Sequence, residues 1–205
     1  MESRALGAVW RTAQTLRPAR VRGKALPRLV FFTDPVRTPD PEPVIARLPR
    51  GAAVVYRPFG AADAVSRGRR LTQLAHHRGL ILLAGADVSL AAAIGADGVH
   101  LPERLAVRAA GIRLARPAWL VTASAHSAAA IVRARRSGAD AVFVSPVFES
   151  ASPSAGRPLG AVRFAALAHG AGLPVFALGG IDPPRARRVA GSGAAGLAAI
   201  EAFLA

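Results

Sequence analysis

The chain contains no cysteine and a single lysine, Lys24, among its 205 residues. The absence of cysteine excludes disulfides, thiolate nucleophiles and thiolate metal ligands. Lys24 lies before the first predicted strand, so a lysine that forms a Schiff base inside the folded domain is excluded as well. Covalent catalysis through a thiol or a lysine is therefore not open to this protein.

Long apolar runs are absent too. No segment reaches the ~18 consecutive apolar residues that a membrane-spanning helix needs. Residues 1–24 carry six basic side chains but lack the apolar core of a secretory signal. We therefore expect a cytoplasmic protein with no membrane partner.

Negative charge is scarce, because 12 acidic residues face 27 basic ones and the net charge is +15. Such an excess can indicate nucleic-acid binding, since clustered basic side chains release counterions from phosphates. The basic clusters here fall on separate segments of helical character, without interleaved aromatic residues that could stack on bases. We therefore interpret the charge as solvated helix faces and expect no nucleic-acid partner. The clusters lie at residues 17–24, 67–70, 133–136 and 185–188.

What the sequence does contain is a repeated alternation of short apolar segments and Ala-, Leu- and Arg-rich segments of helical periodicity. This alternation predicts parallel strands joined by helices, and eight strands are the number that closes a barrel. The sequence thus predicts an α/β fold with a single (β/α)8 TIM barrel. The predicted strands are residues 29–32, 53–57, 80–83, 98–101, 119–123, 141–144, 175–178 and 195–198, with helices at 62–77, 127–136 and 161–169 among others.

The predicted organisation is one barrel at residues 28–205, preceded by a short basic and helical extension at residues 1–27. We expect a helix within residues 1–20 that covers the bottom of the barrel, and only a stub for the last helix. Ser127 and Asp182 stand where helices should begin. Gly79, Gly138 and Gly172 stand where helices should end in a left-handed residue.

The carboxyl ends of the predicted strands carry the residues most suited to chemistry, as expected for this fold. Arg57 follows an apolar strand, where its guanidinium either grips a phosphate or diphosphate or extends past the rim as a surface arginine. Gly179 and Gly180 precede a predicted helix and offer backbone N–H groups to an anion. Together with the turn near Ile200 they predict a phosphate site.

The histidines give weaker indications. His126 follows a predicted strand and could act as an acid or base, although a packing role at a helix start is the preferred interpretation. His100 lies within a strand, but no second ligand stands at a metal-binding spacing. We expect no histidine metal site.

Five short motifs occur in order along the predicted barrel. They are AIGADGVHL at residues 93–101, SAHS at 124–127, GAD at 138–140, SPVF at 145–148 and PVFALGGI at 174–181. Together they resemble the thiamine phosphate synthase / thiazole tautomerase family of phosphate-binding barrels over residues 29–203. The resemblance implies an enzyme of thiamine biosynthesis, a transferase that joins a pyrimidine diphosphate to a thiazole phosphate.

In that reaction the pyrimidine diphosphate ionises to a stabilised carbocation, which the thiazole nitrogen captures. The resemblance implies that the protein holds Mg²⁺ and stabilises the departing pyrophosphate. It assigns one arginine and one hydroxyl-rich loop to the pyrophosphate, and a glycine loop with a nearby backbone segment to the thiazole phosphate. The catalytic residues so assigned are Arg57, Ser124, Ser150 and Ser152, and the phosphate-binding residues are Gly179, Gly180 and Ile200.

Several charged residues of the family pattern are missing from this chain. The two positions at which the family carries carboxylate ligands of Mg²⁺ fall on Ala86 and Leu105, and two lysine positions fall on Phe59 and Pro153. Because Mg²⁺ in such sites depends on one or two carboxylates besides phosphate, we assign no metal ligand. Mg²⁺ stays possible, but without its usual carboxylates.

These departures leave three interpretations open. The first is a synthase of weak or altered activity, in which Asp87 or Glu103 supplies a carboxylate by a shifted register. The second is a non-catalytic binder of thiazole or thiamine phosphate. The third is a thiazole tautomerase-like enzyme, although Pro146 occupies the position of that branch's histidine and Glu149 is the nearest acid–base group. Glu201, where the family usually has a serine, counts against tight phosphate binding.

Overall fold

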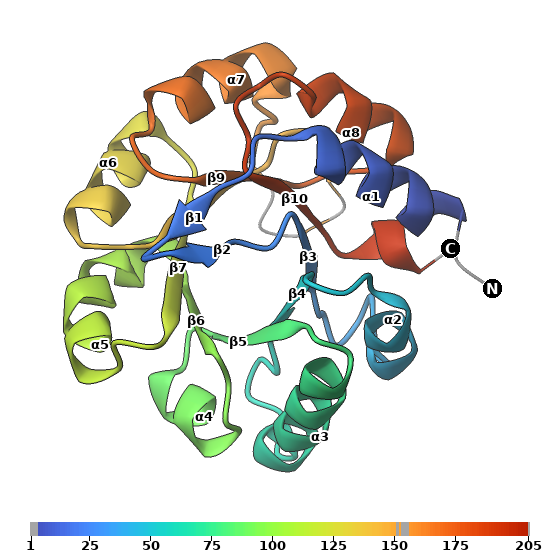
Figure 1. Cartoon of the computed structure of the whole chain (residues 1–205), viewed down its shortest axis with the longest axis vertical. Helices are drawn as coiled ribbons and strands as arrows, with labels where there is room; N and C mark the ends of the chain where they lie inside the picture. Colours follow the sequence, from blue (N-terminus) through green and yellow to red (C-terminus); the bar gives the residue numbers. More distant parts are fainter. Residues whose placement is uncertain (1–3, 151, 153–155, 205) are drawn as a thin grey trace.

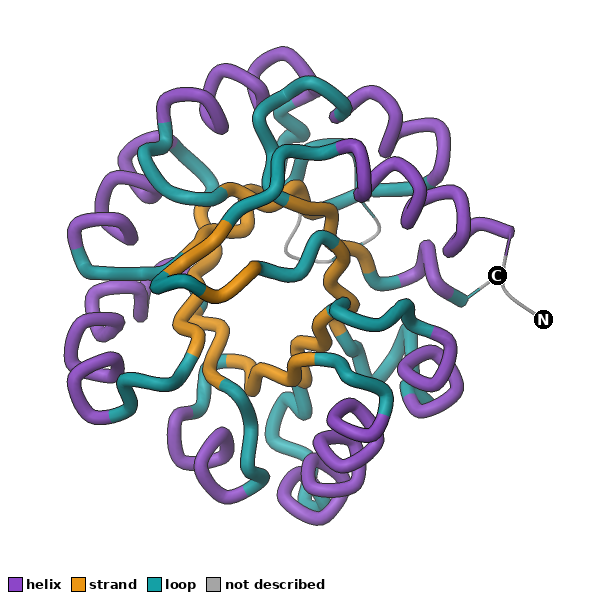
Figure 2. The backbone as a smooth tube through the Cα atoms, in the orientation of Figure 1, coloured by secondary structure: helices purple, strands orange, loops and turns teal. Residues whose placement is uncertain are grey.

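The computed structural model describes residues 4–150, 152 and 156–204. Eight parallel strands close into a barrel in the order β10-β3-β4-β5-β6-β7-β8-β9, with helices around it (Figures 1 and 2). The predicted (β/α)8 fold is confirmed. The barrel strands are β3 (Leu29–Phe32), β4 (Ala53–Tyr56), β5 (Ile81–Gly85), β6 (Gly98–Leu101), β7 (Leu120–Ala125), β8 (Ala141–Val144), β9 (Val175–Leu178) and β10 (Gly196–Ala199).

The helices begin and end where the sequence places its caps. The side chains of Ser127 and Asp182 accept hydrogen bonds from the backbone N–H groups three residues on, and Gly79, Gly138 and Gly172 have the positive φ expected past a helix end. The helices are α1 (Arg4–Thr15), α2 (Glu42–Arg47), α3 (Ala64–His77), α4 (Val88–Ala93), α5 (Ala109–Ala115), α6 (Ala128–Arg136), α7 (Gly160–Gly170) and α8 (Pro183–Val189), with 3-10 turns η1 (Glu103–Arg108) and η2 (Glu201–Phe203).

The predicted strand bounds differ from the observed ones by at most two residues, and one difference matters for the site. Arg57 was placed at the end of its strand, but β4 ends at Tyr56. The backbone N–H of Arg57 donates to the side-chain Oγ1 of Thr33, 2.9 Å away, and not to a carbonyl of a neighbouring strand. Arg57 is therefore the first residue of the loop.

The N-terminal segment forms the predicted helix, α1, but not in the predicted place. Helix α1 packs against α8, η2 and β10 on the side of the barrel (Figure 1), because the short η2 leaves that side open for the apolar stripe of α1. A hairpin of β1 (Arg20–Val21) and β2 (Lys24–Ala25) lies across the bottom instead. Arg22 in its turn donates to the carbonyl oxygen of Trp119 and to the carboxylate of Asp140.

Aromatic side chains fill the barrel interior. The rings of Phe143 and Phe176 stack at 4.7 Å between centroids, and Phe32 and His100 each meet Phe143 edge to face at 5.1 Å. Phe32 and His100 also border the cavity at the carboxyl ends of the strands. These rings therefore form the floor of that cavity. No helix in the described parts of the chain has the length and apolar character needed to cross a membrane.

Candidate active site

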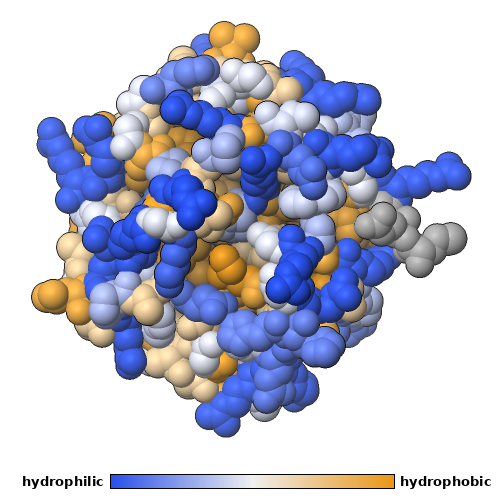
Figure 3. Space-filling view, viewed as in Figure 1, coloured by the Kyte–Doolittle hydropathy of each residue, from blue (hydrophilic) through white to orange (hydrophobic). Residues whose placement is uncertain are grey.

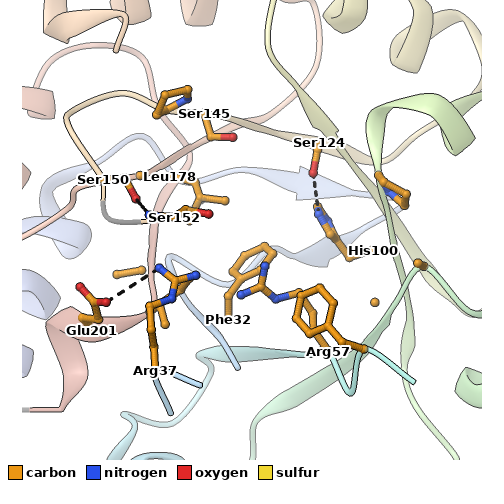
Figure 4. Close-up of a pocket in the computed structure, with 18 of the residues that line it drawn as sticks. Phe32, Arg37, Arg57, His100, Ser124, Ser145, Ser150, Ser152, Leu178 and Glu201 are labelled. Atoms are coloured by element: carbon orange, nitrogen blue, oxygen red, sulfur yellow. Dashed lines mark hydrogen bonds and ion pairs between the residues drawn. The ribbon is translucent and has the colours of Figure 1, made fainter. Parts of the chain in front are cut away.

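A cavity of about 1190 Å³ opens at the carboxyl ends of the strands. It is bordered by loops that follow β3, β4, β5, β6, β7, β8, β9 and β10, so residues distant in sequence meet there (Figure 4). The structure brings every predicted site residue to this cavity. They are Arg57, Ser124, Ser150, Ser152, Gly179, Gly180 and Ile200.

The guanidinium of Arg57 lies between two aromatic rings. Its central carbon is 5.3 Å from the centroid of Phe32 and 5.2 Å from that of Phe59. Its Nε donates to the carbonyl oxygen of Thr33 at 2.8 Å. The side chain is only 24% exposed, so the interpretation of Arg57 as an extended surface arginine is wrong.

One end of this guanidinium has no hydrogen-bond partner. Nη2 of Arg57 is buried and makes no hydrogen bond to any residue described, although it lies 3.5 Å from the Asp34 carboxylate as an ion pair. Burial lowers the pKa of Arg57 to about 10, Asp34 opposes this, and the nearby Arg37 adds to it. Arg57 is therefore still a cation at neutral pH, with a donor available to a ligand.

The end of β5 shows why this arginine can take its position. A Cβ atom at Gly85, the last residue of β5, would lie 2.8 Å from Cγ of Arg57, so a side chain there would push Arg57 away. The next residue, Ala86, has a φ of 65°, a left-handed conformation that asparagine and aspartate tolerate better than alanine. The observed placement of Arg57 thus depends on the residue directly before the position at which the family pattern loses its carboxylate.

His100 holds Ser124 from below. Its Nε2 lies 2.9 Å from Oγ of Ser124 and its Nδ1 lies 3.0 Å from Oγ1 of Thr122. Burial lowers the pKa of His100 to about 3, with a further contribution from the charge of Arg57. The ring is therefore neutral at physiological pH and fixes the Ser124 hydroxyl at the cavity wall.

From the sequence, His100 was weighed only as a metal ligand, and its contact with Ser124 was not predicted. The signal was present in the strand alternation. His100 pairs in register with Thr122 in the neighbouring strand β7, two residues before Ser124, and alternate residues of a strand point to the same side of the sheet.

Two carboxylates were candidates to replace the missing metal ligands, and each already has partners. Asp87 accepts a hydrogen bond from the N–H of Leu90 at 2.9 Å as the N-cap of α4. Glu103 accepts from Arg133 at 2.7 Å and from the backbone N–H of His126 at 3.0 Å. Nδ1 of His126 lies 2.7 Å from the carbonyl oxygen of Ser145, and its exposed ring borders the cavity.

The residues present do not fit a Mg²⁺ site built by the protein. Ala86 offers no ligand at the cavity, and Leu105 is a packed apolar residue. Within residues 4–150, 152 and 156–204, no three side chains of His, Cys, Asp or Glu gather where a metal ion could be held. Pro153, which takes the place of a family lysine, lies outside the described residues.

The phosphate loop after β9 requires glycine. Gly179 and Gly180 have φ values of 95° and 64°, and a Cβ at Gly180 would lie 2.2 Å from the carbonyl oxygen of Glu149. The expected help from the following helix is smaller than predicted, because α8 has only seven residues and Asp182 already accepts from the N–H of Arg185 at 2.7 Å. A phosphate bound here, as predicted, would therefore depend on the loop and its neighbours more than on α8.

Two arginines at the cavity were not predicted. Arg37, in the loop after β3, contacts Asp34 at 2.8 Å and lies 3.9 Å from Glu201. Arg185 lies 3.6 Å from Asp182 and donates to the carbonyl oxygen of Gly180 at 3.3 Å. Arg37 stands in a segment without a strand or motif signal. Arg185 belongs to the basic cluster at residues 185–188, which was interpreted as a solvated helix face, so its position at the cavity was missed.

Comparison with known proteins agrees with this geometry. The chain matches the thiamine monophosphate synthase family over residues 30–203. It is 38% identical over 136 residues to a thiamine biosynthesis bifunctional protein of Symbiobacterium thermophilum, covering 66% of this chain and 28% of that protein. It is 33% identical over 186 residues to a thiamine-phosphate synthase of Synechococcus sp., covering 87% of this chain and 52% of that protein.

Among solved structures, a thiamine phosphate pyrophosphorylase of Pyrococcus furiosus superposes with a TM-score of 0.73 at 27% identity. The match covers 84% of this chain and 85% of that one. The family match and the superposed barrel therefore agree with the resemblance of the sequence motifs. The chain belongs to the thiamine monophosphate synthase family.

Proposed function

We propose that this protein is a transferase that joins a pyrimidine diphosphate to a thiazole phosphate inside the barrel mouth. The observation that carries the proposal is Arg57, a cation held between two rings, whose buried Nη2 makes no hydrogen bond to the described residues. Such a group suits an anion that must be bound out of water, because charge-assisted hydrogen bonds are strongest there. The family and its named relatives support the same reaction class.

In the proposed reaction the C–O bond between the pyrimidine methylene and the diphosphate breaks, and its electron pair leaves with the pyrophosphate. Arg57 stabilises the negative charge that develops on this leaving group. The lone pair of the thiazole nitrogen then forms the new C–N bond. Ser124, fixed by His100, is placed to hydrogen-bond the pyrimidine, and Ser150 and Ser152 offer hydroxyl groups to the pyrophosphate.

The thiazole phosphate is assigned to the opposite part of the cavity. Gly179 and Gly180 border this part of the cavity, where their backbone N–H groups are offered to the phosphate, and Ile200 follows the neighbouring last strand. We also propose that the leaving group relies more on arginine and less on protein-bound Mg²⁺ than in relatives with two carboxylates. One guanidinium carries one charge where Mg²⁺ carries two, so turnover should be slow.

Complementation of a thiamine auxotroph that lacks its own synthase tests the proposal. Growth restored by the wild-type chain, and not by Arg57→Ala, supports it. Arg136→Ala is the matched control, because Arg136 is an exposed arginine of α6 away from the cavity. Failure of the soluble, folded wild-type chain to complement, together with no turnover of the purified protein, contradicts the proposal.

A non-catalytic binder of thiazole or thiamine phosphate is the second candidate. The observation in its favour is that Ala86 and Leu105 supply no carboxylate for Mg²⁺, which weakens stabilisation of the departing pyrophosphate more than it weakens binding of a phosphate ester. The tautomerase alternative has less support, since Pro146 stands in place of the histidine. Calorimetry separates these candidates, because a binder would hold thiazole phosphate without releasing pyrophosphate from the pyrimidine substrate.

A further inference from the structure

Asp34 joins two arginines at the edge of the cavity. Its Oδ2 lies 2.8 Å from Nη2 of Arg37 and 3.5 Å from Nη2 of Arg57, and its Oδ1 accepts the backbone N–H groups of Val36 and Arg37 at 3.1 Å. The carboxylate is only 14% exposed. Asp34 therefore fixes the Arg37 guanidinium in one orientation. Little side-chain entropy is then lost when Arg37 binds an anion.

The other end of Arg37 is held loosely. Its Nη1 lies 3.9 Å from Oε1 of Glu201, which is an ion-pair distance but too long for a hydrogen bond. The Glu201 side chain is 52% exposed and directly follows Ile200 in the proposed phosphate loop. Figure 4 shows the two side chains pointing toward one another across the cavity wall.

Glu201 neutralises the net charge of the arginine–aspartate cluster at this edge of the cavity. Arg37 and Arg57 carry two positive charges and Asp34 carries one negative charge, so the three together carry +1. Glu201 brings the sum to zero. A phosphate that reached Arg37 would therefore have to displace the Glu201 carboxylate from Nη1. This displacement costs little, because an exposed ion pair without a hydrogen bond is weaker than a hydrogen-bonded one.

We propose that Arg37 is a phosphate-binding side chain of the thiazole half of the cavity, and that Glu201 is an internal anion that competes with the substrate phosphate for it. The inference rests on the proposed function for the identity of the substrate, but its chemistry requires only a phosphate monoester. It makes the Arg37–Glu201 pair the element that sets how tightly this chain holds its second substrate.

Titration calorimetry with thiazole phosphate, and with inorganic phosphate as the minimal probe, tests the pair. Removing the competing charge with Glu201→Gln should strengthen binding by about tenfold, and Arg37→Gln should weaken it by roughly tenfold or more, the range for a charged hydrogen bond. Arg187→Gln, an exposed arginine of α8, should leave binding unchanged. Thermal melts confirm that each variant is folded.

The double variant provides the sharpest comparison. If Glu201 acts through Arg37, the double variant Arg37→Gln with Glu201→Gln should bind as weakly as Arg37→Gln alone, because no guanidinium remains to be released. Unchanged or weaker binding by Glu201→Gln, or wild-type affinity in Arg37→Gln, overturns the inference. If the wild type shows no binding, Glu201→Gln must show it, and its failure to do so overturns the inference as well.

These outcomes are separate from those of the proposed function. Shifted phosphate affinities with no turnover would preserve the role of Arg37 and reject the transferase. Turnover with equal phosphate affinities in all variants would support the transferase and reject the role of Arg37.

Discussion

Two arginine–aspartate pairs lie at opposite ends of the barrel and differ in how completely they are satisfied. At the bottom, Arg22 contacts Asp140 at 2.8 Å, and the same carboxylate accepts the backbone N–H of Val121 at 2.8 Å. At the mouth, Arg57 lies 3.5 Å from Asp34 and one of its nitrogens has no hydrogen bond within the described chain.

The difference separates a structural pair from a functional one. The Arg22–Asp140 pair ties the hairpin to the starts of β7 and β8, and its carboxylate is 2% exposed with its bonds made. The Arg57–Asp34 pair has capacity left for a third group. A buried polar group that is fully bonded holds the fold together, whereas one left short of a partner is open to a water molecule or a ligand.

The largest expected effect comes from the pair at the mouth. Arg57→Ala should lower kcat/KM for the pyrimidine diphosphate by about 10²–10³-fold, the range for losing one preorganised donor to a developing charge. Its melting temperature should fall only modestly, because the substitution removes the Nε bond to Thr33 and the contacts with two rings, whereas Nη2 makes no hydrogen bond within the described residues. Steady-state kinetics and calorimetric melts check both parts. A large loss of stability with unchanged kcat/KM would show that the Arg57–Asp34 pair is structural, like the Arg22–Asp140 pair.

The pair at the bottom should behave in the opposite way. Asp140→Ala leaves the N–H of Val121 and the hairpin arginine without their acceptor, at a cost of about 2–3 kcal/mol in the free energy of unfolding. Activity of the folded fraction should not change, because Asp140 lies at the far end of the barrel. Denaturant unfolding gives the stability, and kcat measured well below the melting temperature gives the activity.

The buried histidine gives a pH dependence. Because the pKa of His100 is about 3 in the folded protein and 6.5 ordinarily, the unfolded chain binds the proton more readily. Stability should therefore be full above pH 6.5 and fall progressively as the pH drops toward 3. His100→Gln, which keeps a polar side chain near Ser124, should reduce this slope. Equal slopes in melts of the two proteins from pH 7 to pH 4 would reject the assignment.

The dependence of turnover on Mg²⁺ should be smaller than in an enzyme whose own carboxylates bind the ion. With Ala86 and Leu105 at the two ligand positions, chelation of Mg²⁺ should lower turnover by about tenfold or less, since Mg²⁺ would reach the site only with substrate phosphates and water. Ala86→Asp with Leu105→Asp should make the dependence steeper. Saturating activation of the wild type at micromolar Mg²⁺ would show that another carboxylate completes the site.

The smallest expected effect concerns the ring above Arg57. Phe59 has a φ of 47° and is 69% exposed, a left-handed conformation that is unfavourable for an aromatic residue. Phe59→Gly should relieve strain of about 1 kcal/mol while removing the cover from Arg57. We expect a slightly higher melting temperature and a higher KM for the pyrimidine diphosphate. A lower melting temperature would show that the ring stabilises more than its backbone costs.

The sequence was sufficient for the barrel because its signals are local and repeated. The strands at residues 29–32, 98–101, 141–144 and 175–178 have the predicted bounds, since each is a short apolar run between a glycine or polar turn and a loop. The caps Ser127 and Asp182 are equally local. The position of α1 was not predictable, because it depends on the gap beside the short η2, which lies at the other end of the sequence.

The site could be predicted only in part for the same reason. Arg57, Gly179 and Gly180 directly follow strands, where the fold itself indicates a shared cavity. Arg37 stands five residues beyond its strand, and its role depends on Asp34 and on Glu201 from the other end of the sequence. A local sequence pattern cannot indicate a contact between residues 164 positions apart, so the Arg37–Glu201 pair is visible only in the folded barrel.

Release of pyrophosphate by the purified chain, given pyrimidine diphosphate and thiazole phosphate together, is the decisive measurement. Release should be slow and matched one to one by thiamine phosphate, strongly reduced in Arg57→Ala and unaffected in Arg136→Ala. Binding of both substrates without any release of pyrophosphate, at saturating substrate and with Mg²⁺ supplied, would contradict it.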